Sequence, residues 1–474
     1  MVVYISPTGS DGNSGTINSP WFTINKAWAS SADIIYVRGG TYFYTSDQII
    51  ENKSGITIMN YNNEVPVFDF KNVIGGVTGL FVRGVSNIFM KGFRITNAVQ
   101  PAYPTNIACY GLILWDNVKN SKFELIEADH IGGWGFVIGE NCSDILFLNC
   151  DSHHNADPNT GNGDPYGWSD GFESASPTST NIIFRGCRAW RNSDDGWDLR
   201  RANGYYLIEN CWSFWNGKDD NGVNHGGNGE GFKLGGKSAP ATTTILRTIK
   251  NSLAFENYSV GFTPEPDSTE NELGVEMYNC TSYKNALGIN FEYGNTAIVR
   301  NNIIFANSRA MYSWGSHVTN DHNSFDAADA DFLSVSSVGA DGPRQSDGSL
   351  PSLNFLKLAK GSKLVNAGVN VGIPYSGTAP DLGAYEFNNN MATITTEKGT
   401  YQVTAVVLPA DATDKSLTWS ITGPATVSQT GLVTATGDGT ATVKATAKDG
   451  SGVFGTLPIV ITGQKVLVTA ITLS

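Results

Sequence analysis

One short pattern recurs through the middle of the chain and limits what the chain can fold into. Each copy has alternating apolar residues, then a cysteine, then an asparagine five positions later. Weaker copies end at Asn97, Asn257 and Asn307. Such repetition is typical of a solenoid, in which stacked coils bury one continuous core. The clearest copies are ILFLNCDSHHN (145–155), IIFRGCRAWRN (182–192), YLIENCWSFWN (206–216) and VEMYNCTSYKN (275–285).

The spacing and composition of the copies indicate β-coils. From Asn155 to Asn307, successive asparagines are 37, 24, 41, 28 and 22 residues apart, which is a short period interrupted by insertions. Apolar residues alternate with a period of two, and no helical pattern separates the copies. The 53 glycines and 11% aromatic residues suit β-structure with many tight turns. We therefore predict an all-β chain that begins with a right-handed parallel β-helix.

Stacked coils should place equivalent residues in ladders about 4.8 Å apart. Parallel cysteine side chains at that spacing are poorly aimed for a disulfide, so we expect buried free thiols in the core. The asparagines should form an inward ladder in which each amide satisfies backbone groups of its neighbour. The expected ladders are Cys150, Cys187, Cys211 and Cys280, and Asn155, Asn192, Asn216, Asn257 and Asn285.

A second repeated element follows each asparagine turn and consists of glycine, an apolar residue and a variable residue. The apolar residue should face the core, so strand alternation turns the variable residue outward. Another ladder is formed by the residue just before the glycine, with Asp170, Asp195 and Glu230 as members. The expected exterior ladder reads Val137, Glu173, Asp198, Lys233, Thr263 and Asn290.

This alignment gathers Asp170, Asp194, Asp195 and Asp198 on two adjacent coils. A single Asp-Gly pair usually marks only a turn, but SDGF and NSDDGWD stacked on neighbouring coils indicate more. Four close carboxylates repel one another unless they bind a cation. Oxygen ligands without His or Cys favour Ca²⁺ over Zn²⁺, and the segment lacks the ligand spacing of an EF-hand.

Lys233 lies one coil beyond Asp198 and is the candidate base. An outward lysine is usually a solvated surface residue, but nearby cations, here a metal site with Arg200 and Arg201, favour the neutral amine that a base requires. Insertions at 157–169 and 217–229 should flank the Asp194 coil and wall a groove.

The same stretch, NGEGFKLGGKSAP (228–240), matches a phosphate-binding loop at Gly231, Gly236, Lys237 and Ser238. That loop requires a helix that begins at the Lys-Ser pair. Pro240 and a threonine run follow instead, and coil repeats lie on both sides, so we reject nucleotide binding.

The domain plan follows from a change in composition. The N-terminal segment is expected to cap the helix, and APDLGAYEF (379–387) resembles a closing segment. From Met391 the chain becomes an alternation of Thr, Val and Ala, which resembles a bacterial Ig-like group 2 module. We predict a catalytic β-helix over 1–388, a small Ig-like β-sandwich over 389–465, and the start of a further module or a tail over 466–474.

With these residues assembled, residues 1–388 resemble polysaccharide lyase family 9, most specifically in SDGF, FRGCRAWRNSDDGWDL and NGEGFKLGG. The resemblance implies that the four aspartates bind Ca²⁺ and that Lys233 is the Brønsted base. It also implies a pectic substrate that contains galacturonate, cleaved by β-elimination to C4–C5 unsaturated products. The candidate substrate-binding residues are Arg200, Arg201, Trp168, Lys237 and Glu173.

The resemblance leaves alternatives for the activity. Homogalacturonan is the favoured substrate, and the rhamnogalacturonan-I backbone is the alternative. A glycoside hydrolase would also use paired carboxylates, but it needs fewer than four acids. A non-catalytic, calcium-dependent carbohydrate-binding protein would leave Lys233 unexplained.

The charge and hydropathy of the chain restrict the classes of partner that it can bind. The net charge of −13 argues against nucleic-acid binding, and no stretch is apolar enough to enter a membrane. We expect a secreted or cell-surface monomer whose Ig-like module contacts the cell wall or other modules.

Overall fold

The structure, a computed structural model, separates into two compact units, Met1–Phe387 and Asn388–Ser474. Each unit is described by itself. The structure describes all residues except 74, 76, 162, 164, 175, 201, 225, 236–243, 265–273, 293–295, 388–391, 406, 408–411, 452 and 466–474.

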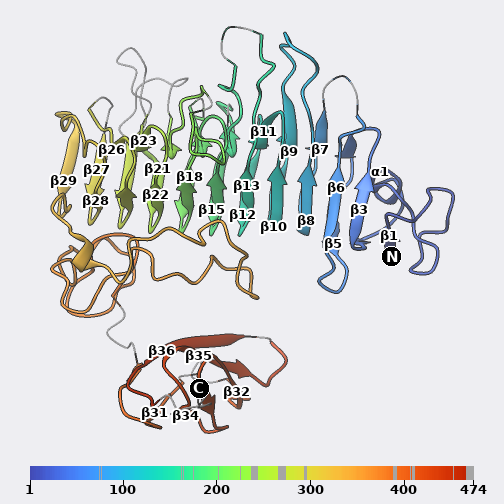
Figure 1. The fold of residues 1–474 in the computed structure, drawn as a ribbon. Helices are drawn as coiled ribbons and strands as arrows, with labels where there is room; N and C mark the ends of the chain where they lie inside the picture. Colours follow the sequence, from blue (N-terminus) through green and yellow to red (C-terminus); the bar gives the residue numbers. More distant parts are fainter. Residues whose placement is uncertain are drawn as a thin grey trace, which may run out of the picture. The chain divides into compact units, whose positions relative to one another are not determined.

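The first unit is a stack of β-coils with parallel strands throughout (Figure 1). One 20-stranded sheet covers two faces of the stack, because β10 (Lys119–Asp129) pairs with β12 through its first half and with β13 through its second. The strand turns between these halves at Leu125, whose φ is 53°. The other strands of this sheet are β1 (Val2–Ile5), β2 (Ile34–Val37), β3 (Gly40–Phe43), β5 (Thr57–Asn60), β6 (Pro66–Asp69), β8 (Phe89–Thr96), β12 (Ser143–Leu148), β13 (Asp151–His153), β15 (Thr180–Arg185), β16 (Arg188–Trp190), β18 (Tyr206–Glu209), β19 (Trp212–Phe214), β21 (Ile245–Lys250), β22 (Leu253–Phe255), β24 (Gly274–Tyr278), β25 (Thr281–Tyr283), β27 (Ala297–Arg300), β28 (Ile303–Phe305) and β29 (Val318–Asp321).

A nine-stranded parallel sheet forms the third face and carries the second repeated element. Its register aligns Phe136 with Phe172, then Trp197, Phe232 and Phe262 on successive coils. All five rings are fully buried, so the predicted inward position is confirmed. The strands are β4 (Gln48–Glu51), β7 (Thr78–Arg83), β9 (Cys109–Trp115), β11 (Gly133–Ile138), β14 (Phe172–Ser174), β17 (Trp197–Asp198), β20 (Phe232–Lys233), β23 (Val260–Thr263) and β26 (Leu287–Ile289).

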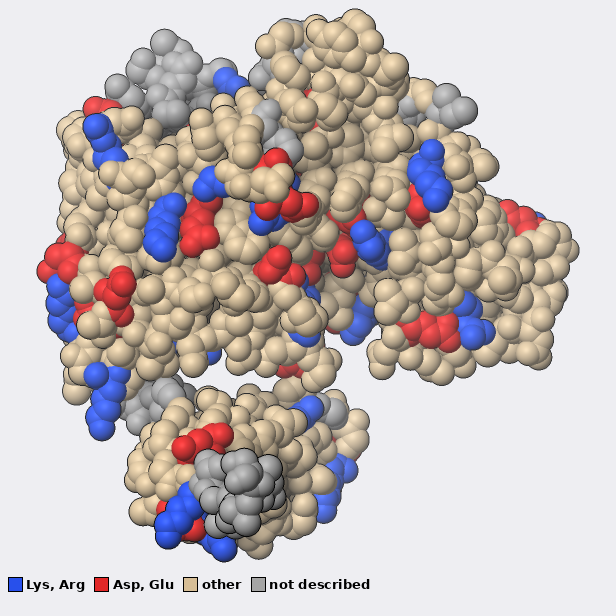
Figure 2. Space-filling view, viewed as in Figure 1, with Lys and Arg blue, Asp and Glu red and all other residues tan. Residues whose placement is uncertain are grey.

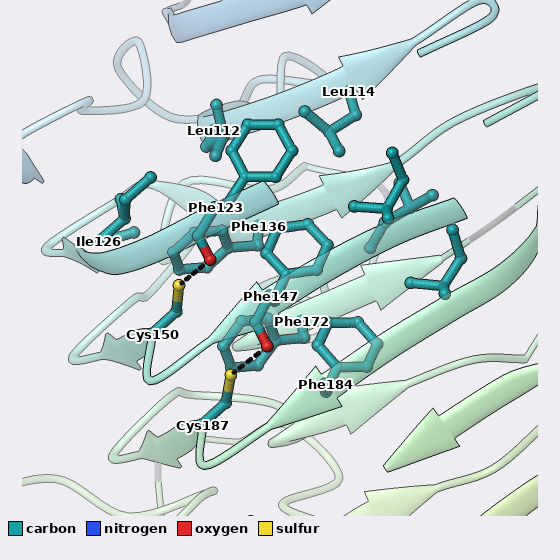
Figure 3. Close-up of a cluster of buried hydrophobic side chains, with 14 of the residues drawn as sticks. Leu112, Leu114, Phe123, Ile126, Phe136, Phe147, Cys150, Phe172, Phe184 and Cys187 are labelled. Carbon is teal, nitrogen blue, oxygen red and sulfur yellow. Dashed lines mark hydrogen bonds between the residues drawn. The ribbon is translucent and has the colours of Figure 1, made fainter. Parts of the chain in front are cut away.

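Stacked rings and thiols fill the core. Phe136 and Phe172 stack with ring centroids 4.8 Å apart, and Phe172 and Trp197 stack at 4.7 Å. Figure 3 shows Cys150 and Cys187 beside this stack, where each thiol reaches a backbone carbonyl of the preceding coil at 3.5 Å. All six cysteines are buried and free, as predicted. Packing and ladder hydrogen bonds, and no disulfide, therefore hold the described coils together.

The asparagine ladder is formed as expected. Asn216 Nδ2 donates to Asn257 Oδ1 at 3.0 Å, and Asn216 Oδ1 accepts from the backbone N–H and Nδ2 of Asn192. The ladder extends to Asn307, which accepts from Asn285. The weaker copy that ends at Asn97 is out of register with this ladder, because strand pairing aligns Thr96 with Asp129 and Asp129 with His153, which leaves Asn97 one residue out of step with Asn155.

Separate segments cover the N-terminal end and one side of the first unit. The short helix α1 (Ile24–Trp28) buries Ile24, Ala27 and Trp28 at the N-terminal end. The exterior of strands β16, β19, β22, β25 and β28 is apolar, and residues within 332–387 form a hydrophobic cluster on it. The short 3₁₀ turn η1 (Asp329–Asp331) immediately precedes this segment. In Figure 1 this segment is the orange chain alongside those strands.

The second unit consists of two small sheets around a core that includes Val433, Ala441 and Ile459. All its strand pairs are antiparallel except β30 with β36 among the described residues. Residues 466–474, where a further module or a tail was expected to start, lie outside the described residues, as do residues 388–391 at the predicted domain boundary. The strands are β30 (Ala392–Ile394), β31 (Thr400–Gln402), β32 (Leu417–Thr422), β33 (Ala425–Val427), β34 (Leu432–Ala435), β35 (Gly439–Ala447) and β36 (Phe454–Ile461).

Candidate active site

Three adjacent strands of the nine-stranded sheet, β14, β17 and β20, carry the candidate residues. The register places Glu173 beside Asp198 and Asp198 beside Lys233. The intervening core rings fix this register, because Trp197 stacks on Phe232 with centroids 4.7 Å apart. The structure therefore has the exterior ladder that the Gly-aromatic repeats predict.

These exterior side chains are nevertheless buried. Lys233 is 4% exposed, Asp198 9% and Asp195 0%. Loop 157–169 contacts the Asp194 coil through its Tyr166 carbonyl, which accepts from Ser193 Oγ at 3.0 Å. Lys233 is therefore not the solvated surface lysine of the alternative interpretation.

Glycine is required where loop 217–229 meets this coil. A Cβ added to Gly227 would lie 2.3 Å from the Ser193 carbonyl oxygen and 2.5 Å from that of Tyr166. One residue later, the backbone N–H of Asn228 donates to Asp194 Oδ1 at 2.6 Å. The two insertions thus meet around the Asp194 coil, as the sequence predicts.

Asp170 and Asp195 each use one oxygen to hold the next coil. The backbone N–H of Asp195 donates to Asp170 Oδ1 at 2.9 Å, and that of Glu230 donates to Asp195 Oδ1 at 2.7 Å. These bonds fix the carboxylate orientations, since a charged acceptor makes a strong hydrogen bond to an amide. The second oxygen of each aspartate contacts another side chain of the site: Asp170 Oδ2 accepts from Trp134 Nε1, and Asp195 Oδ2 lies 3.3 Å from Lys233 Nζ.

Lys233 Nζ lies among the same carboxylates. It is 3.0 Å from Asp198 Oδ2 and 3.3 Å from Asp195 Oδ2. Asp198 is itself held by the backbone N–H of Arg200, which donates to Oδ1 at 2.7 Å. The side chain of Lys233 is thus fixed at the edge of the acidic cluster.

The acidic cluster is electrostatically strained. Burial, followed by the charge of Asp194, raises the pKa of Asp170 well above its usual value. Burial and then the charge of Asp195 do the same for the pKa of Asp194. Burial raises the pKa of Asp195 to about 6, although the ammonium of Lys233 opposes the shift. Such shifts indicate a site that gains stability when a cation neutralises the carboxylates.

Two overlapping sets of oxygens converge closely enough to hold a metal ion. Within each set the ligand atoms lie within 4.8 Å of one another. One set is Asp170, Asp194 and Asp195, and the other is Asp170, Glu173 and Asp198. All the donors are carboxylates, which fits a hard cation such as Ca²⁺. Glu173 was predicted to bind substrate, but it lies among the potential metal ligands. Its own negative charge would repel a uronate carboxylate, so the role of a metal ligand suits it better.

Sequence reasoning missed Trp134, whose indole Nε1–H donates to Asp170 Oδ2 at 2.9 Å. Trp134 stacks between Tyr110, with centroids 5.5 Å apart, and Trp168, with centroids 6.1 Å apart. A signal was present, because Trp134 immediately precedes Gly135 and so occupies the ladder position of Asp170 and Asp195.

The remaining predicted substrate-binding residues divide into two groups. Arg200 and Trp168 are half-buried; Arg200 lies beside Asp198, and Trp168 lies on loop 157–169 against Trp134. Arg201 and Lys237 lie outside the described residues. The structure thus brings the four aspartates, Glu173 and Lys233 together.

Comparison with known proteins agrees with this geometry. Residues 3–303 match the family model for the Pel9A-like, right-handed β-helix region, and residues 388–456 match the bacterial Ig-like domain (group 2). Pectate lyase L of Dickeya chrysanthemi is 35% identical over 419 residues, which cover 82% of this chain and 91% of that protein.

Two solved structures extend the comparison. The crystal structure of pectate lyase Pel9A has a TM-score of 0.67 and 31% identity, covering 82% of this chain and 96% of that one. A rhamnogalacturonan lyase has a TM-score of 0.62 and 24% identity, covering 76% of this chain and 96% of that one, and therefore supports the fold alone. The predicted right-handed β-helix, the Ig-like module and the family resemblance are confirmed: the chain belongs to polysaccharide lyase family 9, with a Pel9A-like β-helix followed by a bacterial Ig-like group 2 domain.

Proposed function

We propose that this protein is a calcium-dependent lyase that cleaves homogalacturonan by β-elimination. The observation that carries the proposal is the contact between Lys233 and a buried carboxylate cluster on adjacent coils. The pectate lyases among its relatives support the substrate class. The products would be oligogalacturonates with a C4–C5 double bond at the new non-reducing end.

Asp170, Asp194, Asp195 and Asp198 would hold the calcium ion, and Glu173 is a fifth candidate ligand. When bound, Ca²⁺ supplies Lewis acidity toward the uronate carboxylate and so stabilises the negative charge that develops when the C5 proton leaves. The hydrogen bonds from the backbone N–H groups of Asp195 and Glu230 would keep the ligand oxygens in place. This arrangement is preorganised, since the register of the coils sets it before substrate binds.

Lys233 would remove the C5 proton as its neutral amine. The electron pair of the C5–H bond becomes the C4–C5 double bond, and the C4–O bond breaks. A water molecule or an acid of the protein would protonate the leaving oxygen. The ion pairs of Lys233 with Asp195 and Asp198 favour the charged ammonium, so neutralisation of these carboxylates would release the base.

Homogalacturonan is favoured over the rhamnogalacturonan-I backbone by the 35% identity to a pectate lyase over most of the chain. The basic residues around the coils favour neither substrate as a group. Arg188 is buried and paired with Asp151, and Arg185 pairs with Glu209. Figure 2 shows basic and acidic side chains intermixed on the face viewed.

Incubation with polygalacturonate, with and without a calcium chelator, tests the proposal. We expect ultraviolet absorbance from the new double bond only when calcium is present. New reducing ends without absorbance would instead indicate a hydrolase, and neither signal would indicate a binding protein. Faster product formation from rhamnogalacturonan-I than from polygalacturonate would overturn the substrate assignment.

The domain roles are part of the same proposal. The β-helix over 1–388 would carry catalysis, and the Ig-like module over 389–465 would contact the cell wall or neighbouring modules. A polymeric wall substrate places the protein outside the cell, as a secreted or cell-surface protein, and we expect it to act as a monomer. Among the described residues, no helix is long and apolar enough to cross a membrane.

A further inference from the structure

A cationic hollow lies at the corner of the coils next to the candidate active site. Arg191, Trp215, Glu256 and Lys284 each immediately precede an asparagine of the ladder. All four have left-handed backbone conformations, with φ between 51° and 57°. Because the following asparagine turns inward, these side chains lie on the outside of successive coils. They line a hollow of about 330 Å³ together with Lys218 and Gly222.

The described residues that line the hollow carry a net positive charge. Arg191, Lys218 and Lys284 are cationic, whereas Glu256 is the one anion that lines the hollow. The exposed Asp220 on the same loop also pairs with Arg191, with its Oδ1 3.3 Å from Arg191 Nε, so one positive charge remains in excess. Glu256 is also engaged locally, because its Oε2 accepts from Trp215 Nε1 at 2.7 Å and from Ser337 Oγ at 3.1 Å. Excess positive charge in a partly enclosed space attracts an anion.

Two of the three cations, Lys218 and Arg191, are held in place, whereas Lys284 is exposed. Lys218 Nζ donates to the Glu256 carbonyl at 2.5 Å, and the guanidinium of Arg191 lies 4.7 Å from the Trp215 ring centroid. Burial, opposed by Glu256 and then reinforced by Arg191, lowers the pKa of Lys218. Fixed, partly desolvated cations bind a carboxylate more strongly than mobile surface lysines do.

One loop contributes residues to the hollow and contacts the acidic cluster. Lys218 and Gly222 belong to loop 217–229, and further along this loop the backbone N–H of Asn228 binds Asp194. Its start is fixed where the N–H of Gly217 donates to the Asn192 carbonyl at 2.8 Å. One loop therefore connects a calcium-type site with a cationic hollow. A polymer that carries a carboxylate on each sugar matches two such sites.

We propose that this hollow binds a uronate carboxylate of the acidic polysaccharide, away from the bond that is cleaved. The proposal rests on the proposed function, because it names a second contact for the same substrate. The volume of the hollow is at the lower end of the range for small-ligand sites, which suits one sugar ring. Lys218, Lys284 and Arg191 contact the carboxylate, and Glu256 holds Trp215 in place.

Calorimetry with trigalacturonate in the presence of chelator tests the hollow apart from catalysis. We expect the wild-type protein to bind trigalacturonate, and binding to weaken about tenfold in Lys284→Gln and further in Lys218→Gln/Lys284→Gln. The Lys284→Gln variant should fold normally, because Lys284 is exposed. It therefore tests the hollow even if the double variant, which also loses the bond from Lys218 to the backbone, does not fold. The exposed Lys360→Gln variant is the matched control and should bind like wild type.

Neutral maltotriose and inorganic phosphate distinguish a uronate site from a site that binds any sugar or any anion. Maltotriose should not bind, and phosphate should bind much more weakly than trigalacturonate. Equal binding of phosphate, or unchanged trigalacturonate affinity in both lysine variants, would overturn the proposal. If wild type cleaves polygalacturonate but does not bind trigalacturonate in chelator, only the hollow is refuted. If wild type forms no unsaturated product, the proposed function itself fails.

Discussion

Lys233 Nζ lies 3.0 Å from Asp198 Oδ2, and the two residues occupy the same rung position on adjacent coils. This relationship joins the candidate base to the candidate metal ligands. An ammonium between carboxylates retains its proton, whereas a base must accept one. The acidic cluster would therefore control the base as well as hold the metal, and the two roles can be separated by substitution.

Replacement of Lys233 by Ala should remove elimination activity while calcium still binds. Loss of a general base lowers the rate about 10²–10⁴-fold. Calcium affinity should stay the same or increase, because the ammonium that competes for Asp195 and Asp198 is gone. Product absorbance measures the first quantity and calorimetry with calcium the second. Activity within about tenfold of wild type would refute the base assignment.

Replacement of Trp134 by Phe should weaken calcium binding about tenfold without loss of folding. The change removes the hydrogen bond from Nε1 to Asp170 Oδ2, and a bond to a charged group contributes about 1.5–3 kcal/mol. A phenyl ring still fills the space between Tyr110 and Trp168. Trp168→Phe is the control and should leave calcium affinity near that of wild type. Identical calcium affinity in Trp134→Phe and wild type would contradict a positioning role for Trp134.

Calcium should stabilise the protein more at neutral than at acidic pH. The folded-state pKa of Asp195 is raised to about 6, above the usual value of an aspartate. Between these values the folded state binds more protons than the unfolded state, so this group's contribution to stability falls as pH rises from about 4 to about 6. A bound cation removes that penalty.

Thermal unfolding with calcium and with chelator, at about pH 4.5 and about pH 7.5, measures the effect. The gain in Tm from calcium should be larger at the higher pH. Asp170→Asn/Asp195→Asn should show little gain at either pH, because two of the converging ligands have lost their charge. An equal gain at both pH values in wild type would contradict the coupling.

The repeated elements allow the β-helix and the core of the site to be predicted, because a fixed register turns sequence alignment into spatial proximity. Glu173, Asp198 and Lys233 align by their Gly-aromatic partners alone. The weaker copy that ends at Asn97 lies one residue out of register with the asparagine ladder, and only strand pairing shows this difference.

Other features depend on contacts that repetition does not encode. Lys233 is buried although its ladder position faces outward, and the two insertions that meet at the Asp194 coil have no repeated pattern from which their paths could be read. Likewise, the apolar exterior residues Trp190, Phe214 and Phe255 are covered by a segment from far along the chain. Trp134 and Asp170 occupy the same ladder position on adjacent coils, so the sequence alignment places them side by side. It does not show that the indole N–H donates a hydrogen bond to the carboxylate.

The asparagine ladder gives the last prediction, because it couples the coils that carry the site. Asn216→Ala should lower the free energy of unfolding by about 2–4 kcal/mol, since it removes the acceptor for Asn192 and the donor to Asn257 inside a buried turn. Urea unfolding measures this loss. The exposed Asn221→Ala, on the neighbouring loop, should stay within about 0.5 kcal/mol of wild type. Similar stability of the two variants would show that adjacent coils are held by core packing alone, and that the amide ladder sets register without adding stability.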